Sequence, residues 1–364
     1  MKIAILSAVN IRHMSLISLY TDILKKNGYE YDIIYMDKYG EEEDFECAHK
    51  YRYVNHVKQT WPKIFKRIKY MMYFPYAARI LNKNKYDFVI VWNDVAIFMF
   101  ASYLARKYKG KYCLNVRDDM GYDKKIYKKR YEKVFKNAAF RTVSSKGYLD
   151  ILPQGLDYLQ IHSLNLSALD GMQKHDRLRN EDEPIRIGFI GYVRYFERNQ
   201  KLLDVFANDS RFEVHYYGTK ANVLKEYAEQ NGIKNTVFHD SFPVSDTKLY
   251  LEKIDIINNL YGNDTLNVRK AISIKFFHAL YSKIPILVCD NTYVGELAKN
   301  VGIGFEVIDI DTEMKENLYN WYRGLDFEKM SENCDKFLEN SKAENKQFGE
   351  VVLKTLKDME NNNK

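Results

Sequence analysis

The stretch IRIGFIGYVRYFER, residues 185–198, begins as an apolar run, reaches a glycine at position 191 and continues into two arginines. A short and almost uninterrupted apolar run is typical of a strand buried in a parallel sheet. The chain opens in the same way, because KIAILSAV (2–9) precedes a polar loop and a segment of helical periodicity. We therefore expect two α/β units, each built around an early central strand.

Short apolar runs alternate with helical patterns along the rest of the chain. Further strands are expected at 86–94, 111–119, 140–145, 212–218, 254–262 and 284–290. This alternation is typical of parallel sheets covered by helices. The predicted fold class is α/β, with two Rossmann-like domains that face a cleft and with helices at the C-terminal end.

The domain boundaries follow from a polar segment in the middle of the chain. Residues 166–184 are rich in charged side chains and end in a proline, which predicts an interdomain linker. We expect a first Rossmann-like domain over 1–165 and a second over 185–330. Residues 331–364 have helical periodicity, and we expect helices there that can cross back to the first domain.

The composition excludes several classes of protein. The chain has 364 residues, of which 46% are hydrophobic and 29% charged, so it is neither disordered, nor collagenous, nor a coiled coil. Its four cysteines lie more than 40 residues apart, which excludes a disulfide scaffold and fits a reducing compartment. Asn93 and Asp94 interrupt the longest apolar stretch, and the N-terminal apolar run is short. We therefore expect no membrane span, no secretory signal and a cytoplasmic location.

Positive charge is concentrated in the front half of the chain. Residues 1–165 carry 29 Lys and Arg against 17 Asp and Glu, whereas the remainder carries 27 against 32, which together give the net charge of +7. The segment 47–86 contains ten Lys or Arg and no acidic residue. Within it, WPKIFKRIKYMMYF (61–74) can place Ile64, Phe65, Ile68 and Met72 on one helical face with basic residues beside them.

Three interpretations of this basic segment are open. An amphipathic basic helix is typical of a protein that lies on an anionic membrane. Basic residues interleaved with aromatic ones also fit single-stranded nucleic acid. The third interpretation is a solvated helix whose aromatic side chains face the core. We predict that 47–86 meets an anionic membrane surface and that the protein binds no nucleic acid, so it should be peripheral on the inner face of the membrane.

A second stretch, SIKFFHALYSKIPILV (273–288), predicts an anion site. Ser273 is a good N-cap, and Lys275 lies in the first turn of the helix that follows, where free N–H groups favour negative charge. His278 lies one turn further, within reach of a ribose. In the stretch quoted first, Gly191 allows close approach of the backbone, and the two arginines, Arg194 and Arg198, offer planar groups that suit phosphate oxygens.

The order of these pieces resembles the group-1 family of GT-B glycosyltransferases, which use nucleotide sugars. The family's two donor-binding motifs are matched by Gly191, Arg194, Arg198, Ser273, Lys275, Phe277, Ala279, Leu280 and Pro285. GELAKNVGIGFEV (295–307) is similar to the family's closing motif, with Glu296 and Gly304 in place. The family's two spaced glutamates are replaced by Ala271 and His278, and its first loop lacks paired glycines, so the chain resembles a divergent member.

The resemblance implies roles for these residues. The donor would be bound by Gly191, Arg194, Arg198, Ser273, Lys275, His278 and Glu296. Arg194 and Lys275 would also act in catalysis, because they would stabilise the charge that develops on the departing diphosphate. No metal and no other cofactor is expected, since cationic side chains would stabilise the negative charge of the diphosphate in place of a metal ion. The resemblance further implies a hexosyltransferase-type reaction that retains the anomeric configuration.

Three polar residues of the first domain follow strands and are expected at the same edge of the sheet. His13 follows the first strand, and Asp118 and Asp119 end the strand at 111–119. A carboxylate there can act as a general base or orient a sugar hydroxyl. We predict catalytic roles for His13 and Asp118.

The sequence and the resemblance together predict a glycosyltransferase that moves a sugar from a nucleotide-sugar donor to a saccharide acceptor. The resemblance places this reaction in the biosynthesis of a surface polysaccharide such as a capsule, with a lipid-linked saccharide as the acceptor. Two alternatives stay open. One is a nucleotide-sugar epimerase of the same fold, and the other is a non-enzymatic protein that binds nucleic acid or other anions through its basic front half.

The acceptor that we expect is a saccharide carried on a lipid, because the basic front half would hold the enzyme at the membrane where such acceptors lie.

Overall fold

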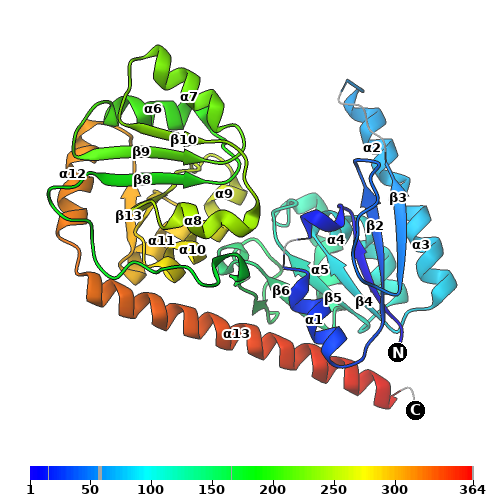
Figure 1. Cartoon of the computed structure of the whole chain (residues 1–364). Coiled ribbons are helices and arrows are strands. Elements are labelled where there is room, and N and C mark those ends of the chain that lie inside the picture. The colour runs from blue at the N-terminus through cyan, green and yellow to red at the C-terminus, as the bar shows by residue number, and fades with distance from the viewer. Residues whose placement is uncertain (15, 56–59, 165, 363–364) are drawn as a thin grey trace. The chain divides into compact units, whose positions relative to one another are not determined.

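The computed structural model describes residues 1–362 except 15, 56–59 and 165. The chain forms two compact units (Figure 1). The first comprises Met1–His162 together with Ala343–Lys364, and the second comprises Ser163–Lys342. Each unit is described separately below.

The first unit is built on a parallel sheet of seven strands in the order β3-β2-β1-β4-β5-β6-β7. The strands are β1 (Ile3–Ser7), β2 (Tyr31–Asp37), β3 (His49–Val54), β4 (Phe88–Trp92), β5 (Tyr112–Val116), β6 (Phe140–Val143) and β7 (Leu159–Gln160). Every residue of β1, β4 and β5 is buried, as expected for central strands that helices cover on both faces. The outer strand β3 was not predicted, because its residues HKYRYV are only half-buried and alternate with basic side chains.

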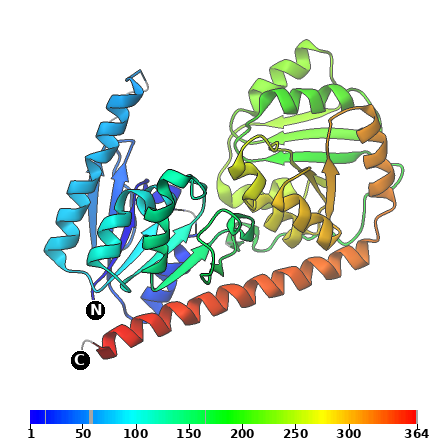
Figure 2. The ribbon, with the colours of Figure 1, turned by 180° about the vertical axis from the view of Figure 1, so that it is seen from behind.

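The helices of the first unit are α1 (Ser18–Lys26), α2 (Lys63–Met71), α3 (Tyr73–Asn84), α4 (Asp94–Lys107) and α5 (Lys125–Lys136). On one face of the sheet, Tyr20 of α1 packs with Ile5, Ile33 and Ile90 of the strands. Helices α3 and α4 contact the strands as well, and α5 packs against α4. Figure 2 shows α2 standing out from the sheet of this unit.

The second unit has a parallel sheet of six strands in the order β10-β9-β8-β11-β12-β13. The strands are β8 (Ile185–Ile190), β9 (Phe212–Tyr217), β10 (Thr236–His239), β11 (Ile256–Asn259), β12 (Ile286–Cys289) and β13 (Gly304–Val307). The helices are α6 (Phe196–Phe206), α7 (Ala221–Gln230), α8 (Thr247–Leu251), α9 (Leu266–Lys270), α10 (Ile274–Ser282), α11 (Tyr293–Val301) and α12 (Thr312–Arg323). The predicted α/β class with two Rossmann-like sheets is confirmed.

Side chains of the second sheet alternate between two separate cores. Ile187 and Phe189 of β8 point to the core that contains α6, α7 and α12, whereas Ile190 belongs to the core formed with α8, α10 and α11. This period of two follows from the pleat of a strand. Leu169 and Met172, from the segment predicted as a linker, also lie in the second of these cores.

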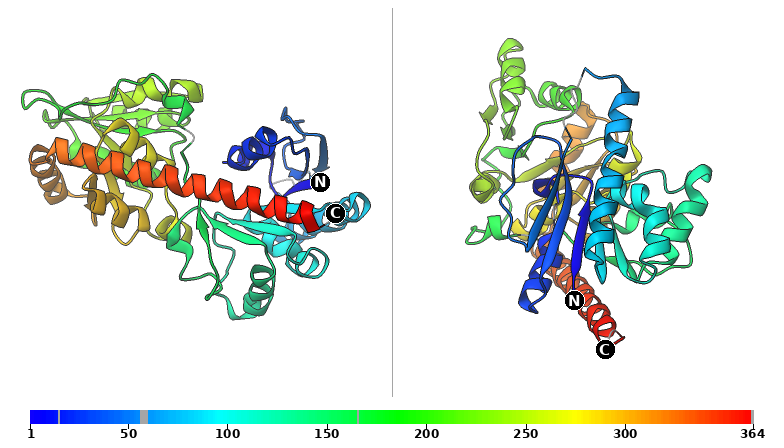
Figure 3. Two further views of the ribbon diagram at one scale, coloured as in Figure 1. Left: turned by 90° about the horizontal axis from the view of Figure 1, so that it is seen from below. Right: turned by 90° about the vertical axis from the view of Figure 1, so that its right-hand side faces the viewer.

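The C-terminal helix α13 (Phe327–Asn362) contributes to both units and is one continuous helix (Figure 3). Its first part places Met330, Cys334 and Leu338 in a core of the second unit. Its last part places side chains in a core of the first unit, namely Phe348, Val352 and Leu356. The spacing of four residues within each set keeps these side chains on one helical face. In the described part of the chain, no helix is both long and apolar enough to cross a bilayer.

Candidate functional site

A cavity of about 330 Å³ opens at the carboxyl ends of β8, β11 and β12, which is the edge where open parallel sheets bind ligands. We call it the sheet-edge cavity. It is lined by Arg194, Tyr195, Asn259, Tyr261, Gly262, Thr265, Asn267, Val268, Ala271, Ser273, Cys289, Thr292 and Val294. Of the residues predicted from the sequence, Arg194 and Ser273 lie in this wall.

Helices α10 and α11 are among the helices that begin at the sheet-edge cavity. Ser273 caps α10, because its hydroxyl oxygen accepts a hydrogen bond from the backbone N–H of Lys275 at 3.2 Å. Thr292 caps α11 in the same way, with the N–H of Gly295 as donor at 3.1 Å. The positive ends of both helix dipoles therefore meet at the cavity, and this arrangement favours an anion.

Two loops beside the cavity pack backbone against backbone. Gly218, after β9, has φ +137, and a Cβ atom placed there would lie 2.0 Å from the carbonyl oxygen of Gly191. The N–H of Gly191 donates to the carbonyl of Tyr217 at 2.8 Å. Such an approach is possible only because Gly218 has no side chain, whereas a Cβ atom on Gly191 would meet nothing within 4 Å.

This packing brings two cations to one aromatic ring. Arg194 and Lys220 approach the ring of Tyr192, at 5.4 Å and 5.1 Å from its centroid. Lys220 was not predicted as a site residue. Its position two residues after the strand 212–218 was the signal that could have indicated it.

Lys275 lies behind the cavity wall and is only 4% exposed. Its ammonium group donates to the carbonyl of Asn258 at 3.1 Å and lies 3.1 Å from the ring centroid of Phe189. It is 5.0 Å from the ring centroid of Tyr261, which does line the cavity. Because no acidic side chain among the described residues is paired with it, burial lowers the pKa of Lys275 well below its usual value. Contact between Lys275 and a phosphate stays a prediction.

The other residues predicted for donor binding lie around this wall. Arg198 is half-buried, with a guanidinium nitrogen 3.9 Å from the Cys289 sulfur. Burial, together with the charge of Lys275, lowers the pKa of His278 to about 4. Glu296 is exposed in the first turn of α11. Their contacts with a ligand stay predictions.

Asn259 is a polar residue of the cavity that sequence reasoning missed. It is 3% exposed, and its side-chain oxygen is buried without a hydrogen-bond partner. A buried polar atom without a partner costs free energy, so such an atom in a cavity wall indicates a place for a ligand group. The signal was the pair Asn258-Asn259 at the end of an otherwise apolar strand.

In the first unit, a buried carboxyl group organises the end of β5. Asp94 is 2% exposed and accepts hydrogen bonds from the Tyr122 hydroxyl at 2.5 Å and from the backbone N–H of Asp118 at 2.8 Å. The N–H of Arg117 also donates to it, at 3.1 Å. Asp118 itself is exposed, and a carboxylate oxygen of Asp119 accepts from the N–H of Gly121. Asp94 was not predicted, although it ends the strand at 86–94.

His13 has a different neighbour. It is exposed, and its Nε2 atom lies 2.9 Å from the hydroxyl of Tyr39, in the loop after β2. No contact joins it to Asp118 among the described residues. The catalytic roles predicted for His13 and Asp118 stay predictions.

The pKa of Asp94 predicts a pH dependence of stability. Burial outweighs the three donors and raises this pKa to about 7. The folded state therefore binds a proton more tightly than the unfolded state, and Asp94 should make the protein less stable as pH rises from about 4 to about 7, by up to about 1.4 kcal/mol per pH unit. Chemical denaturation at several pH values should show that Asp94→Asn removes this slope. A slope unchanged in the variant would contradict the assignment.

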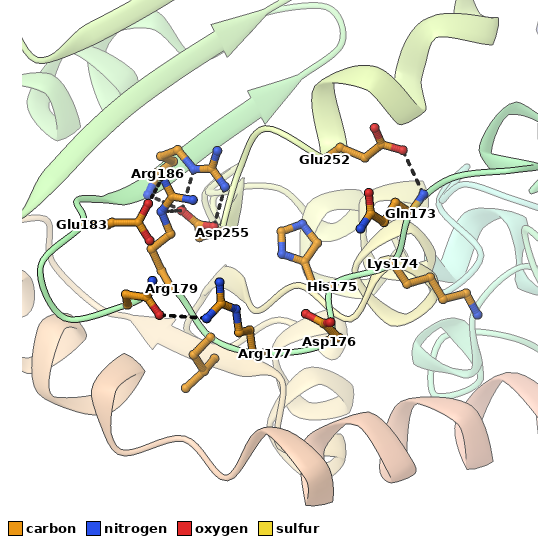
Figure 4. A pocket seen from close by; sticks show the side chains of 12 residues that line it. Gln173, Lys174, His175, Asp176, Arg177, Arg179, Glu183, Arg186, Glu252 and Asp255 are labelled. Atoms are coloured by element: carbon orange, nitrogen blue, oxygen red, sulfur yellow. Dashed lines mark hydrogen bonds and ion pairs between the residues drawn. The ribbon is translucent and has the colours of Figure 1, made fainter.

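A second pocket, shown in Figure 4, lies at the opposite edge of the second sheet, near the start of β8. Arg186 and Asp255 form a paired contact there, with a nitrogen–oxygen distance of 2.7 Å. Arg179 pairs with Glu183 at 3.1 Å. These ion pairs hold the segment 173–183 on the second unit, so we assign this pocket a structural role.

Comparisons with known proteins identify the fold. No family model matches the chain, and no curated protein sequence matches it. Solved structures do match over almost the whole chain. A glycosyltransferase from Rickettsia africae is 14% identical, with 98% of this chain and 99% of that chain covered and a TM-score of 0.68. Anabaena HepE in complex with UDP is 13% identical, with 97% and 100% covered and a TM-score of 0.65.

Enzymes of another class share the architecture. UDP-GlcNAc 2-epimerase from Neisseria meningitidis, bound to UDP-GlcNAc, is 11% identical, with 97% of this chain and 100% of that chain covered and a TM-score of 0.61. The chain therefore has the GT-B fold, as the resemblance implied. The described residues include no group of three His, Cys, Asp or Glu side chains that could hold a metal ion.

Proposed function

We propose that this chain is a glycosyltransferase that takes a sugar from a nucleotide-sugar donor and passes it to a saccharide acceptor. The observation that carries the proposal is the meeting of two helix N-termini and Arg194 at the sheet-edge cavity. A diphosphate suits this place, because N–H groups and a guanidinium stabilise its negative charge. The structural neighbours that bind UDP and UDP-GlcNAc support a nucleotide-sugar as the ligand.

Asn259 supports a ligand that also carries hydroxyl groups. A hydroxyl can donate to the amide oxygen or accept from the amide nitrogen, so it satisfies the buried end of Asn259 whichever way the amide is turned. A phosphate oxygen can only accept. We therefore assign Asn259 to a hydroxyl of the donor, on its sugar or its ribose.

In the proposed reaction, the bond between the anomeric carbon and the diphosphate oxygen breaks, and a bond to the acceptor oxygen forms. Negative charge grows on the departing diphosphate, where Arg194, Lys275 and the N-termini of α10 and α11 would stabilise it. Asp118, exposed at the end of β5, would accept the proton of the acceptor hydroxyl as a general base, or orient that hydroxyl while the proton passes to the departing diphosphate. Retention of configuration, a hexosyl donor and an acceptor in surface polysaccharide assembly rest on the family resemblance.

An epimerase is the second candidate, because UDP-GlcNAc 2-epimerases share the fold. The two candidates differ in their need for an acceptor. An epimerase converts its nucleotide-sugar without any other substrate, whereas a transferase leaves the sugar unchanged or hydrolyses it slowly. Product analysis of nucleotide-sugars incubated with the protein alone separates the two.

A thermal-shift panel of nucleoside diphosphates and nucleotide-sugars tests the proposed function directly. A ligand at 100 times its Kd should add about 2.7 kcal/mol of stability, because it binds only the folded state. Inorganic phosphate and nucleosides without phosphate serve as controls, and we expect little response to either. If no nucleoside diphosphate and no nucleotide-sugar stabilises the protein, the proposed function is wrong.

A further inference from the structure

Helix α2 exposes an apolar stripe to solvent. Ile64, Phe65, Ile68, Met71 and Met72 are each at least half exposed, at 59%, 56%, 50%, 69% and 50%. Their spacing of one, three and four residues places them along one side of a helix. Met72 keeps helical dihedral angles, so the stripe continues without a break to the end of α2. Five large apolar side chains on one exposed stripe indicate an interaction surface for a protein or a membrane.

The stripe is bordered by positive charge. At about 100° per residue, Arg67 and Lys69 lie just beyond its two edges, whereas Lys66 lies on the opposite side of the helix. Arg67 is exposed and Lys69 half-buried. No acidic residue occurs in the whole segment 47–86.

The elements next to α2 in the segment 47–86 pack against the rest of the first unit, so α2 is the described part of the segment that stays exposed. Helix α3 buries Tyr73, Ala77 and Leu81. The Tyr76 hydroxyl donates to the carbonyl of Arg52 in β3 at 3.0 Å. The sequence predicted a membrane-contacting surface over 47–86. In the structure, the part of this segment that exposes the apolar stripe is the nine residues 64–72.

We propose that α2 docks on an anionic lipid bilayer, with its apolar stripe at the level of the acyl chains and its bordering cations among the headgroups. An apolar stripe flanked by Lys and Arg is complementary to such an interface in both polarity and charge. A nucleic-acid surface would instead call for several stacking rings, and Phe65 is the stripe's single aromatic residue. This surface is separate from the sheet-edge cavity, so the proposal stands or falls independently of the proposed function.

Vesicle co-sedimentation of the full chain tests the proposal. We expect binding to vesicles of phosphatidylcholine with phosphatidylglycerol, weaker binding as salt is raised, and little binding to phosphatidylcholine alone. The double variant Phe65→Glu with Ile68→Glu should lose about tenfold or more in partitioning, because two charges would have to enter the interface. Both side chains are exposed, so the variant should melt at the temperature of the unmodified protein.

Ile126→Glu is the matched control. Ile126 is 82% exposed on α5, another helix rich in lysine, and its replacement should change partitioning less than about twofold. The proposal is overturned if the double variant binds the anionic vesicles as well as the unmodified protein does. It is equally overturned if the unmodified protein binds none of the vesicles. It is also overturned if size-exclusion chromatography shows a dimer that the double variant dissociates, because a second copy would then cover the stripe.

Discussion

Replacing Lys275 by methionine should stabilise the ligand-free protein and at the same time remove its response to nucleotides. The ammonium group is buried, has one hydrogen bond to a backbone carbonyl and lies against the Phe189 ring. A buried charge without an acidic partner costs stability, and methionine fills a similar volume without that cost. We expect a gain of about 1–3 kcal/mol near neutral pH.

The pH dependence of this gain gives a second measurement. The pKa of Lys275 is lowered in the folded state. The buried charge of Lys275 therefore destabilises the folded protein below the ordinary pKa of lysine, and this destabilisation disappears as pH rises toward that value. The stability gained by Lys275→Met should accordingly shrink between neutral and alkaline pH. Denaturation curves of both proteins at several pH values measure it.

Lys283→Met is the control for Lys275→Met. Lys283 follows α10 and is buried as well, but its ammonium group contacts Asp335 and the carbonyl of Ser331. Its replacement leaves those acceptors without a donor, so we expect a loss of stability and an unchanged nucleotide response. If Lys275→Met keeps the full nucleotide-dependent shift, Lys275 does not serve the donor phosphates.

Replacing Gly218 by alanine should have the largest effect on the second unit. The new Cβ atom would lie 2.0 Å from the carbonyl oxygen of Gly191, and backbone on both sides cannot move apart without opening the loops after β8 and β9. We expect a loss of about 3 kcal/mol, seen as a lower melting temperature. The nucleotide response should fall with it, because Arg194 and Lys220 would separate.

Gly232→Ala shows how much of this effect is due to dihedral strain alone. Gly232 also has a positive φ, +66, but a Cβ atom there meets nothing within 4 Å. We expect a cost of about 1 kcal/mol and a normal nucleotide response. Equal melting temperatures for the two variants would argue against the close approach of the two loops.

The central strands could be predicted from the sequence because burial on both faces makes them uniformly apolar. The run 185–193 predicted β8, and the run 86–94 predicted β4. The edge strand β3 could not be predicted in this way, since its side chains are half-buried and include basic residues. Its place in the sheet depends on β2, the preceding strand, which pairs with it in parallel.

The residues of the candidate site that could be predicted are those whose position depends on short-range sequence patterns. Ser273 as an N-cap and Arg194 after a strand follow from short-range rules, and both lie in the wall of the cavity. The burial of Lys275 could not be foreseen, because it depends on Phe189 and Tyr261, which are distant in sequence. Asp94 was missed for the same reason, since its partners lie more than 20 residues away.

Helix α13 contributes to the cores of both units, and this affects when the first unit can complete its folding during synthesis. Phe348, Val352 and Leu356 complete the hydrophobic interior around β1, yet the ribosome adds them long after that strand. The sheet of the first unit therefore lacks part of its core until this stretch of α13 has been made. A truncation before Phe348 should destabilise the first unit, although it leaves every strand of that sheet in the chain.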